Sequence, residues 1–278
     1  MLSSGVLSGL LGALSFGGGD FAGASAARRA GALLAVACAH SVGLLALLVG
    51  LAVFRPPLPG ADAIVVATAA GVAGMVGLAA LYRGMALGSM GIVTAVAGAG
   101  SLVLPLAVGA LRGQPVGPLQ LVGVACAAGA AAAASGASRD EVGRRALALA
   151  GLAALAFGAW YVLIDLAASA GDSLWALVFS RAASAGIATV VVAVRGVDRS
   201  AIPWALLVAA GLLDVGGNVF FVLARDAIPI GLAAAIVGLY PVVTMLLARF
   251  VIGERLPAVG LVGVALAILG IVLISAGG

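Results

Sequence analysis

Apolar runs of about twenty residues cover nearly the whole chain, and short turns carrying arginine, proline or glycine separate them. A helix needs roughly 20 apolar residues to cross a bilayer. The clearest turn is Arg55-Pro56-Pro57-Leu58-Pro59-Gly60, where prolines prevent a helix from continuing. The pattern predicts ten transmembrane helices, at about 5–25, 31–53, 62–82, 88–110, 118–137, 146–168, 173–194, 202–224, 229–250 and 257–276.

The composition supports a protein that lies almost wholly in the lipid bilayer. The 278 residues are 64% hydrophobic and 9% charged, whereas soluble domains carry about 25% charged residues. Glycine occupies 42 positions, and small residues let helices pack closely in lipid. We therefore predict an all-α, polytopic (multi-pass) membrane protein, and we expect the cell (cytoplasmic) membrane as its location.

The two halves of the chain resemble each other. A shift of 140 residues places Leu121-Val122-Gly123-Val124-Ala125 on the identical run 261–265, and also aligns glycines such as Gly113 with Gly253. A polar linker at 138–145 divides the chain near its midpoint. We predict two five-helix repeats, at 1–137 and 146–278. Because five is odd, the repeats should be inverted, as in secondary transporters that bind substrate between their repeats.

The segment 234–254 predicts a membrane helix that is broken near its middle. Tyr240-Pro241 interrupts the apolar run, and a proline removes a backbone hydrogen bond and kinks a helix. Such a break is tolerated at membrane depth where protein or a water-filled cavity surrounds it. The first repeat has Ser101 in place of Pro241 and Gln114 in place of Glu254. We expect Glu254 and Arg255 to form an exposed or interfacial ion pair that fixes the turn.

Charge and cysteine usage exclude several classes of function. The net charge is +4 and all 14 basic residues are arginines, scattered at helix ends without a basic patch, so nucleic acid is not an expected partner. The single histidine and two isolated cysteines have no metal-site spacing, and no cofactor is expected. Most arginines follow odd-numbered helices, which by the positive-inside rule places both termini outside the cytoplasm.

Ionisable residues inside spanning segments are costly and are therefore candidates for function. The set comprises Asp20, His40, Asp165, Arg181 and Asp214, with the amide Asn218. Asp214 and Asn218 are four residues apart, so they share a helix face that either binds substrate or protons or makes an interhelical hydrogen-bond pair. Arg181 either pairs with Asp165 or Asp214, binds a substrate carboxylate, or extends to the interface.

The remaining candidates have both structural and functional interpretations. The alignment of the repeats places His40 on Arg181; a lone histidine either shuttles protons or packs in a satisfied site. We expect Asp20, after Gly17-Gly18-Gly19 near the end of the first helix, to be an interfacial cap. Trp160 and Tyr161 either stack on a substrate or anchor the helix at the interface. Tyr240 is expected at the helix break, where a hydroxyl can contact substrate.

The ordered set of motifs resembles the EamA-type family of the drug/metabolite transporter superfamily. The resemblance rests on Tyr240-Pro241 with Gly253-Glu254, on the glycine-rich segment 260–270, on Phe179-Ser180-Arg181 and on the segment 14–21. It implies ten helices, termini in the cytoplasm (opposite to the arginine count) and export of small organic molecules, often amino acids or related metabolites.

We therefore predict a secondary transporter for small organic metabolites, possibly coupled to protons, that works by alternating access as a monomer or homodimer. The alternatives are a channel or structural membrane subunit, or a membrane-embedded enzyme. The sequence contains no HExxH or GxSxG-type motif, and no filter-like loops repeat between its helices, so no enzymatic activity is expected.

Overall fold

A computed structural model describes residues 2–113, 115–137, 140–196, 202–225, 227–228, 233 and 236–276. These residues form a bundle of α-helices, with no strand in the part of the chain described. The helices are α1 (Leu2–Ala30), α2 (Ala32–Phe54), α3 (Ala61–Leu87), α4 (Met90–Ser101), α5 (Val103–Leu111), α6 (Pro118–Ala137), α7 (Glu141–Ser169), α8 (Ser173–Arg195), α9 (Trp204–Arg225), α11 (Tyr240–Val251) and α12 (Ala258–Ala276).

Seven spans in the described residues are long and apolar enough to cross a membrane: α2, α3, α4 with α5, most of α7, α8, most of α9, and α12. The helices α6 and α11 contain shorter apolar stretches. Large apolar side chains cover the outer faces, for example Leu45, Val65 and Leu155, each more than 60% exposed. The chain is thus built to meet lipid, and the prediction of a polytopic all-α membrane protein is confirmed.

The predicted boundaries fit α6 and α8 closely but not α1, α4 or α7. The helix α1 continues past the predicted end at 25, through Arg28 and Arg29, to Ala30. The linker predicted at 138–145 is shorter than expected, because Asp140 caps α7 and residues from Glu141 are already helical. Residues 138–139, and most of the region before α11 where the ninth helix was predicted to begin, lie outside the described residues.

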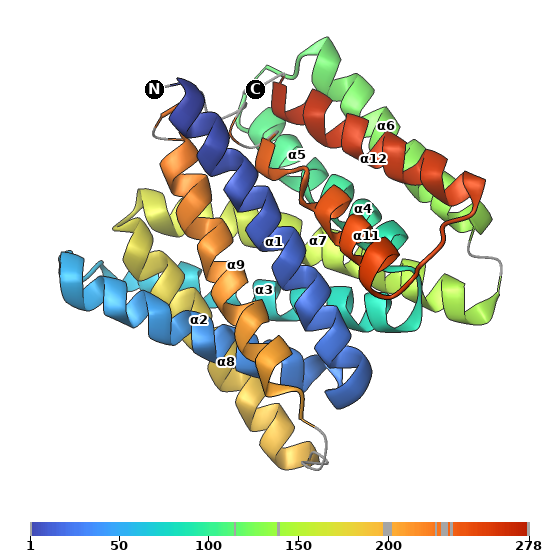
Figure 1. Cartoon of the computed structure of the whole chain (residues 1–278). Helices are drawn as coiled ribbons and strands as arrows, with labels where there is room; N and C mark the ends of the chain where they lie inside the picture. Colours follow the sequence, from blue (N-terminus) through green and yellow to red (C-terminus); the bar gives the residue numbers. More distant parts are fainter. Residues whose placement is uncertain are drawn as a thin grey trace.

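Close helix pairs join the two halves of the chain. Helix α1 packs along α9, α2 along α8, α3 along α7 and α6 along α12, as Figure 1 shows for α1 with α9 and for α6 with α12. Small residues make these approaches possible: a Cβ built at Gly71 would lie 2.2 Å from the carbonyl oxygen of Ser180 on α8. Without a hydrophobic force between helices in lipid, such backbone contact is a main source of association.

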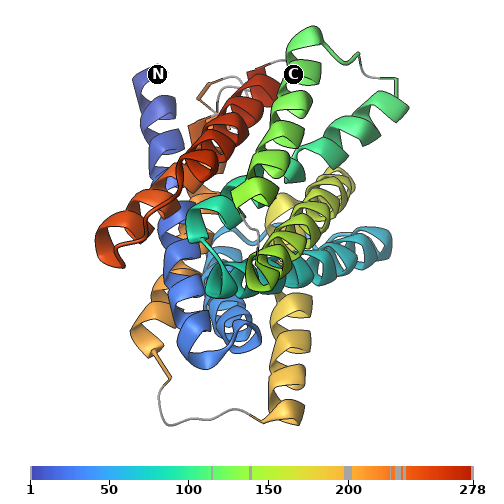
Figure 2. The ribbon, with the colours of Figure 1, turned by 90° about the vertical axis from the view of Figure 1, so that its right-hand side faces the viewer.

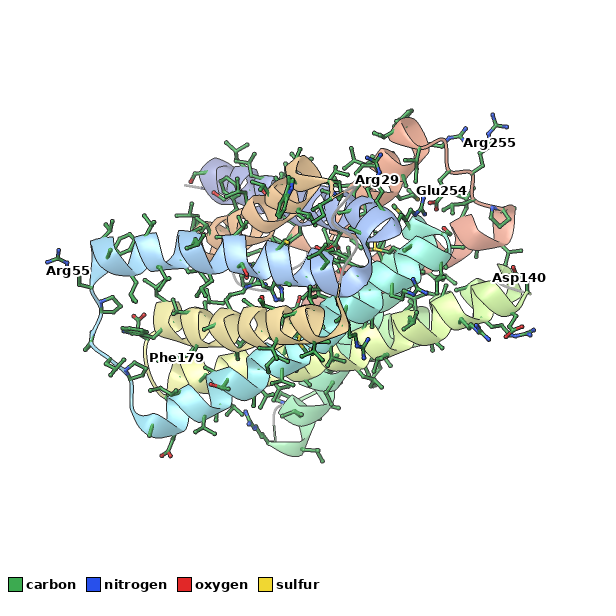
Figure 3. All side chains as sticks on the ribbon, turned by 90° about the horizontal axis from the view of Figure 1, so that it is seen from below. Arg29, Arg55, Asp140, Phe179, Glu254 and Arg255 are labelled. Carbon is green, nitrogen blue, oxygen red and sulfur yellow. The ribbon has the colours of Figure 1, made fainter. Side chains whose placement is uncertain are left out.

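The bundle has two ends. Figures 1 and 2 place both termini at the same end of the molecule. Arg29, Asp140, Glu254 and Arg255 gather at one end of the view in Figure 3, and Arg55 lies at the other. Arg28 binds across helices at the end of α3, where its guanidinium donates to the carbonyl oxygen of Met85 at 3.0 Å. This bond explains why the charged end of α1 remains helical.

Candidate functional site

An ion pair between Arg181 on α8 and Asp214 on α9 lies inside the bundle. The two side chains are 10% and 18% exposed. Both residues come from the second half of the chain. Of the two partners predicted for Arg181, Asp214 is the one that it contacts. Asp165 is instead exposed near the end of α7 and takes no part in this pair.

His40 lies beside this pair and is 3% exposed. Its Nδ1 forms a hydrogen bond with the hydroxyl of Ser184, and its ring interacts electrostatically with Arg181. The sequence had aligned His40 with Arg181 through the repeat, and the two residues are indeed neighbours. Ser184 was not predicted, although its position three residues after Arg181 places both on one face of α8.

Asp20 lies within α1, and the expectation of an interfacial cap at the end of the helix is wrong. The helix runs for ten more residues after Asp20, and Gly17 to Gly19 are helical. A Cβ built at Gly19 would lie 3.3 Å from the backbone nitrogen of Asp214, so α1 and α9 cross closely there. Asp20 interacts electrostatically with Asp214. The three glycines therefore serve helix packing, where the sequence had suggested a turn.

All three tyrosines of the chain converge on Asp20. Tyr82 on α3, Tyr161 on α7 and Tyr240 at the start of α11 each interact electrostatically with this carboxylate. Tyr82 is 1% exposed and packs against Gly23, whereas Tyr161 is 42% exposed. The sequence had singled out Tyr161 and Tyr240, but nothing around Tyr82 indicated a position inside a polar cluster.

We define the central cluster as the set of polar side chains that these contacts connect: Asp20, His40, Tyr82, Tyr161, Arg181, Ser184, Asp214 and Tyr240. Two predicted residues lie at its margin. The amide of Asn218 donates to the backbone carbonyl of Asp214 at 2.8 Å, a bond within α9 in place of an interhelical one. Trp160 donates to the hydroxyl of Ser180 at 3.3 Å and stacks edge-on against Tyr161.

The predicted break at Tyr240-Pro241 is the beginning of α11. Both residues lie in its first turn, where a missing N–H costs nothing because those groups have no partner inside the helix. Thr244, one turn later, donates to the carbonyl oxygens of Gly17 and Tyr240, which fastens α11 to α1. In the first half, α4 ends at Ser101 and α5 follows at Val103, so an interruption occurs near the aligned position.

Glu254 caps the N-terminus of α4, and the expected ion pair with Arg255 is wrong. Its carboxylate accepts hydrogen bonds from the Ser89 hydroxyl at 2.5 Å and from the N–H groups of Met90 at 3.1 Å and Gly91 at 3.3 Å. A carboxylate at a helix N-terminus also complements the helix dipole. The turn after α11 is thus tied to the first half of the chain. Gln114, its counterpart in the alignment, lies outside the described residues.

No group of three or more His, Cys, Asp and Glu side chains in the described part of the chain could hold a metal ion. The chemistry of the central cluster is therefore that of its own groups. Two carboxylates and an imidazole can hold or release protons, a guanidinium holds a counter-charge, and tyrosine rings offer polar hydroxyls and aromatic faces.

Comparison with known families decides the class of this membrane protein. The sequence profile of the EamA-like transporter family matches residues 144–276. Residues 144–276 belong to the EamA-like transporter family. The chain is therefore a multi-pass membrane protein of the drug/metabolite transporter type, and the predicted resemblance is confirmed. The matched residues include Arg181, Asp214 and Tyr240, and hence half of the central cluster.

The fold of the whole chain also has a solved counterpart. A crystal structure titled "Crystal structure of protein" superposes with a TM-score of 0.67 at 17% identity, over 99% of this chain and 98% of that one. At this identity the likeness concerns the fold alone. A search among curated proteins found no match to the chain.

Proposed function

We propose that this EamA-like protein is a secondary transporter that carries small organic metabolites across the cytoplasmic membrane by alternating access. The observation that carries the proposal is the central cluster, a set of charged and aromatic side chains inside an apolar bundle. Charged groups at membrane depth are costly and typically mark pathways for substrates or ions.

The origin of the cluster residues supports a site between two moving halves. Asp20, His40 and Tyr82 come from the first half, whereas Arg181 and Asp214 come from the second. Inverted-repeat transporters bind substrate at such a boundary, and the two halves rock around it.

The arrangement of helices supports two inverted five-helix repeats. The packing of α1 on α9 has its counterpart in α7 on α3, as expected if a two-fold axis exchanges the halves. Gly113 and Gly253, aligned by the shift of 140 residues, both have positive φ values, 82° and 71°, in the turns that follow α5 and α11. Because L-residues avoid this conformation, the two turns share one backbone requirement.

Access to the cluster is favoured on the side of α7. Tyr161 is 42% exposed and nevertheless acts on Asp20, which itself is partly accessible. A substrate could therefore reach the cluster along the α7 side of the bundle.

A comparison of metabolites inside and outside cells, with and without the protein, would identify candidate substrates. Gradient-driven uptake of those candidates into proteoliposomes then tests the mechanism. Saturable uptake is the expected result. Uptake that rises linearly with concentration would favour a channel, and the absence of any flux would favour a structural subunit or an enzyme.

A further inference from the structure

Asp20 is the one ionised group of the central cluster that lacks a partner. Arg181 is paired with Asp214, and His40 is bonded to Ser184. Within the described residues, the Asp20 carboxylate makes neither a hydrogen bond nor an ion pair. A carboxylate inside a membrane protein is normally paired with a cation or with hydrogen-bond donors, so this position calls for a partner from outside the chain.

Aromatic rings surround this carboxylate. Aromatic residues make up only 5% of the chain, yet all three of its tyrosines act on Asp20. Phe16 lies one helical turn before Asp20 on α1, and its ring meets that of Tyr240 edge-on at 6.4 Å. Such rings attract a cation with their faces, most strongly where water is excluded.

The charge balance has the same sign. With both carboxylates ionised, Asp20 and Asp214 contribute two negative charges and Arg181 contributes one positive charge, which leaves one negative charge uncompensated. One positive charge, from a proton or from a bound cation, would neutralise the cluster.

We propose that Asp20 and the tyrosines around it bind the positively charged group of an organic cation, an amine or a quaternary ammonium, in exchange for a proton. This proposal names the substrate class of the proposed transporter and rests on that function. When the cation binds, the carboxylic acid of Asp20 releases its proton to water; when the cation leaves, the carboxylate takes up a proton.

The groups that face Asp20 set the direction of the pH dependence. They are Asp214 on α9, Tyr82 on α3, Tyr161 on α7 and Tyr240 on α11, with Arg181 on α8 and His40 on α2 beyond Asp214. Because a proton and the cation compete for one carboxylate, the affinity for the cation should rise as the pH rises.

The same geometry disfavours a zwitterionic amino acid. Its ammonium group would fit Asp20, but its carboxylate would have to displace Asp214 from Arg181, the only buried guanidinium among the described residues. An amine without a carboxylate avoids this cost.

The test measures binding to purified full-length protein by titration calorimetry in two buffers of different ionisation enthalpy. The probes are benzyltrimethylammonium, phenylalanine and benzoate. We expect the cation alone to bind, with release of about one proton per cation. Asp20→Asn should weaken its binding about tenfold or more and abolish proton release, whereas Asp165→Asn, which removes an exposed carboxylate outside the cluster, should change neither. Binding of phenylalanine or benzoate in preference to the cation, or proton release that persists in Asp20→Asn, would overturn the proposal.

A second pair of variants keeps the test independent of the folding of Asp20→Asn. Tyr161→Leu removes an aromatic face at a partly exposed position and should weaken binding of the cation, while Tyr161→Phe retains the face and should restore it. Equal binding by the two variants would contradict an aromatic contribution. Exchange in proteoliposomes separates the two proposals: exchange of phenylalanine without exchange of the cation leaves the transporter standing and removes the cation site. Binding of the cation without any exchange does the reverse.

Discussion

Breaking the buried pair between Arg181 and Asp214 should destabilise the protein strongly, and removing both charges should not. Asp214→Asn leaves a guanidinium that is 10% exposed and cannot lose its proton. Removal of one partner from a buried ion pair costs about 3–5 kcal/mol, and an unpaired charge at the centre of a spanning helix costs about 2.5–3.5 kcal/mol on insertion scales. We therefore predict a loss of about 3 kcal/mol for Asp214→Asn or Arg181→Gln alone.

The double variant Arg181→Gln with Asp214→Asn should recover most of that loss, because replacement of a whole buried pair is often nearly neutral. The free energy of unfolding can be measured by titrating sodium dodecyl sulfate into mixed micelles and following tryptophan fluorescence. Arg145 and Glu141 form a matched control pair with side chains 71% and 68% exposed, and Arg145→Gln should change the free energy by less than about 1 kcal/mol. If the losses of the two buried single variants simply add in the double variant, the pairing is not energetically real.

Three further predictions follow from other contacts. Asp214→Asn should slow transport and flatten its pH dependence; an unchanged rate and pH profile in proteoliposomes would remove Asp214 from the pathway. Glu254→Ala removes the acceptor of three hydrogen bonds at the start of α4 and should cost about 1.5–3 kcal/mol in the same unfolding assay, whereas exposed Arg255→Ala should cost less than about 0.5 kcal/mol; equal losses would argue against the cap. Gly71→Ala places a methyl group 2.2 Å from a carbonyl oxygen of α8 and should cost about 1–3 kcal/mol. Gly151→Ala, at a helical position with open space around it, should instead be neutral or stabilise by up to about 1 kcal/mol; the opposite order would contradict the packing described.

The spans were predictable because two strong local signals define them. Apolar length fixes where a helix can cross, and proline with glycine fixes where it must stop; the predicted 118–137 agrees with α6. The end of α1 was missed because Gly17 to Gly19 and the two arginines resemble a turn in sequence. In the fold, those glycines admit the backbone of α9, and Arg28 binds the end of α3. Neither neighbour is visible in the local sequence.

The central cluster was predictable only in part. The cost of charge in lipid identified Asp20, His40, Arg181 and Asp214 from their type and depth. Their partners depend on how helices cross, and the sequence left Arg181 with two candidate carboxylates. Glu254 shows the same limit, because its ligands on α4 lie more than 160 residues away in the chain. Adjacent Arg255 was the only partner that the local sequence offered.

Counterflow in proteoliposomes tests the central claim, that the protein is a carrier with one site reached alternately from two sides. Vesicles loaded with unlabelled substrate are diluted into a trace of labelled substrate. A carrier should accumulate label transiently above its equilibrium level, and Asp214→Asn should reduce that overshoot while Asp165→Asn leaves it unchanged. Label that rises to equilibrium without an overshoot would mean an open pathway, and would contradict alternating access at the central cluster.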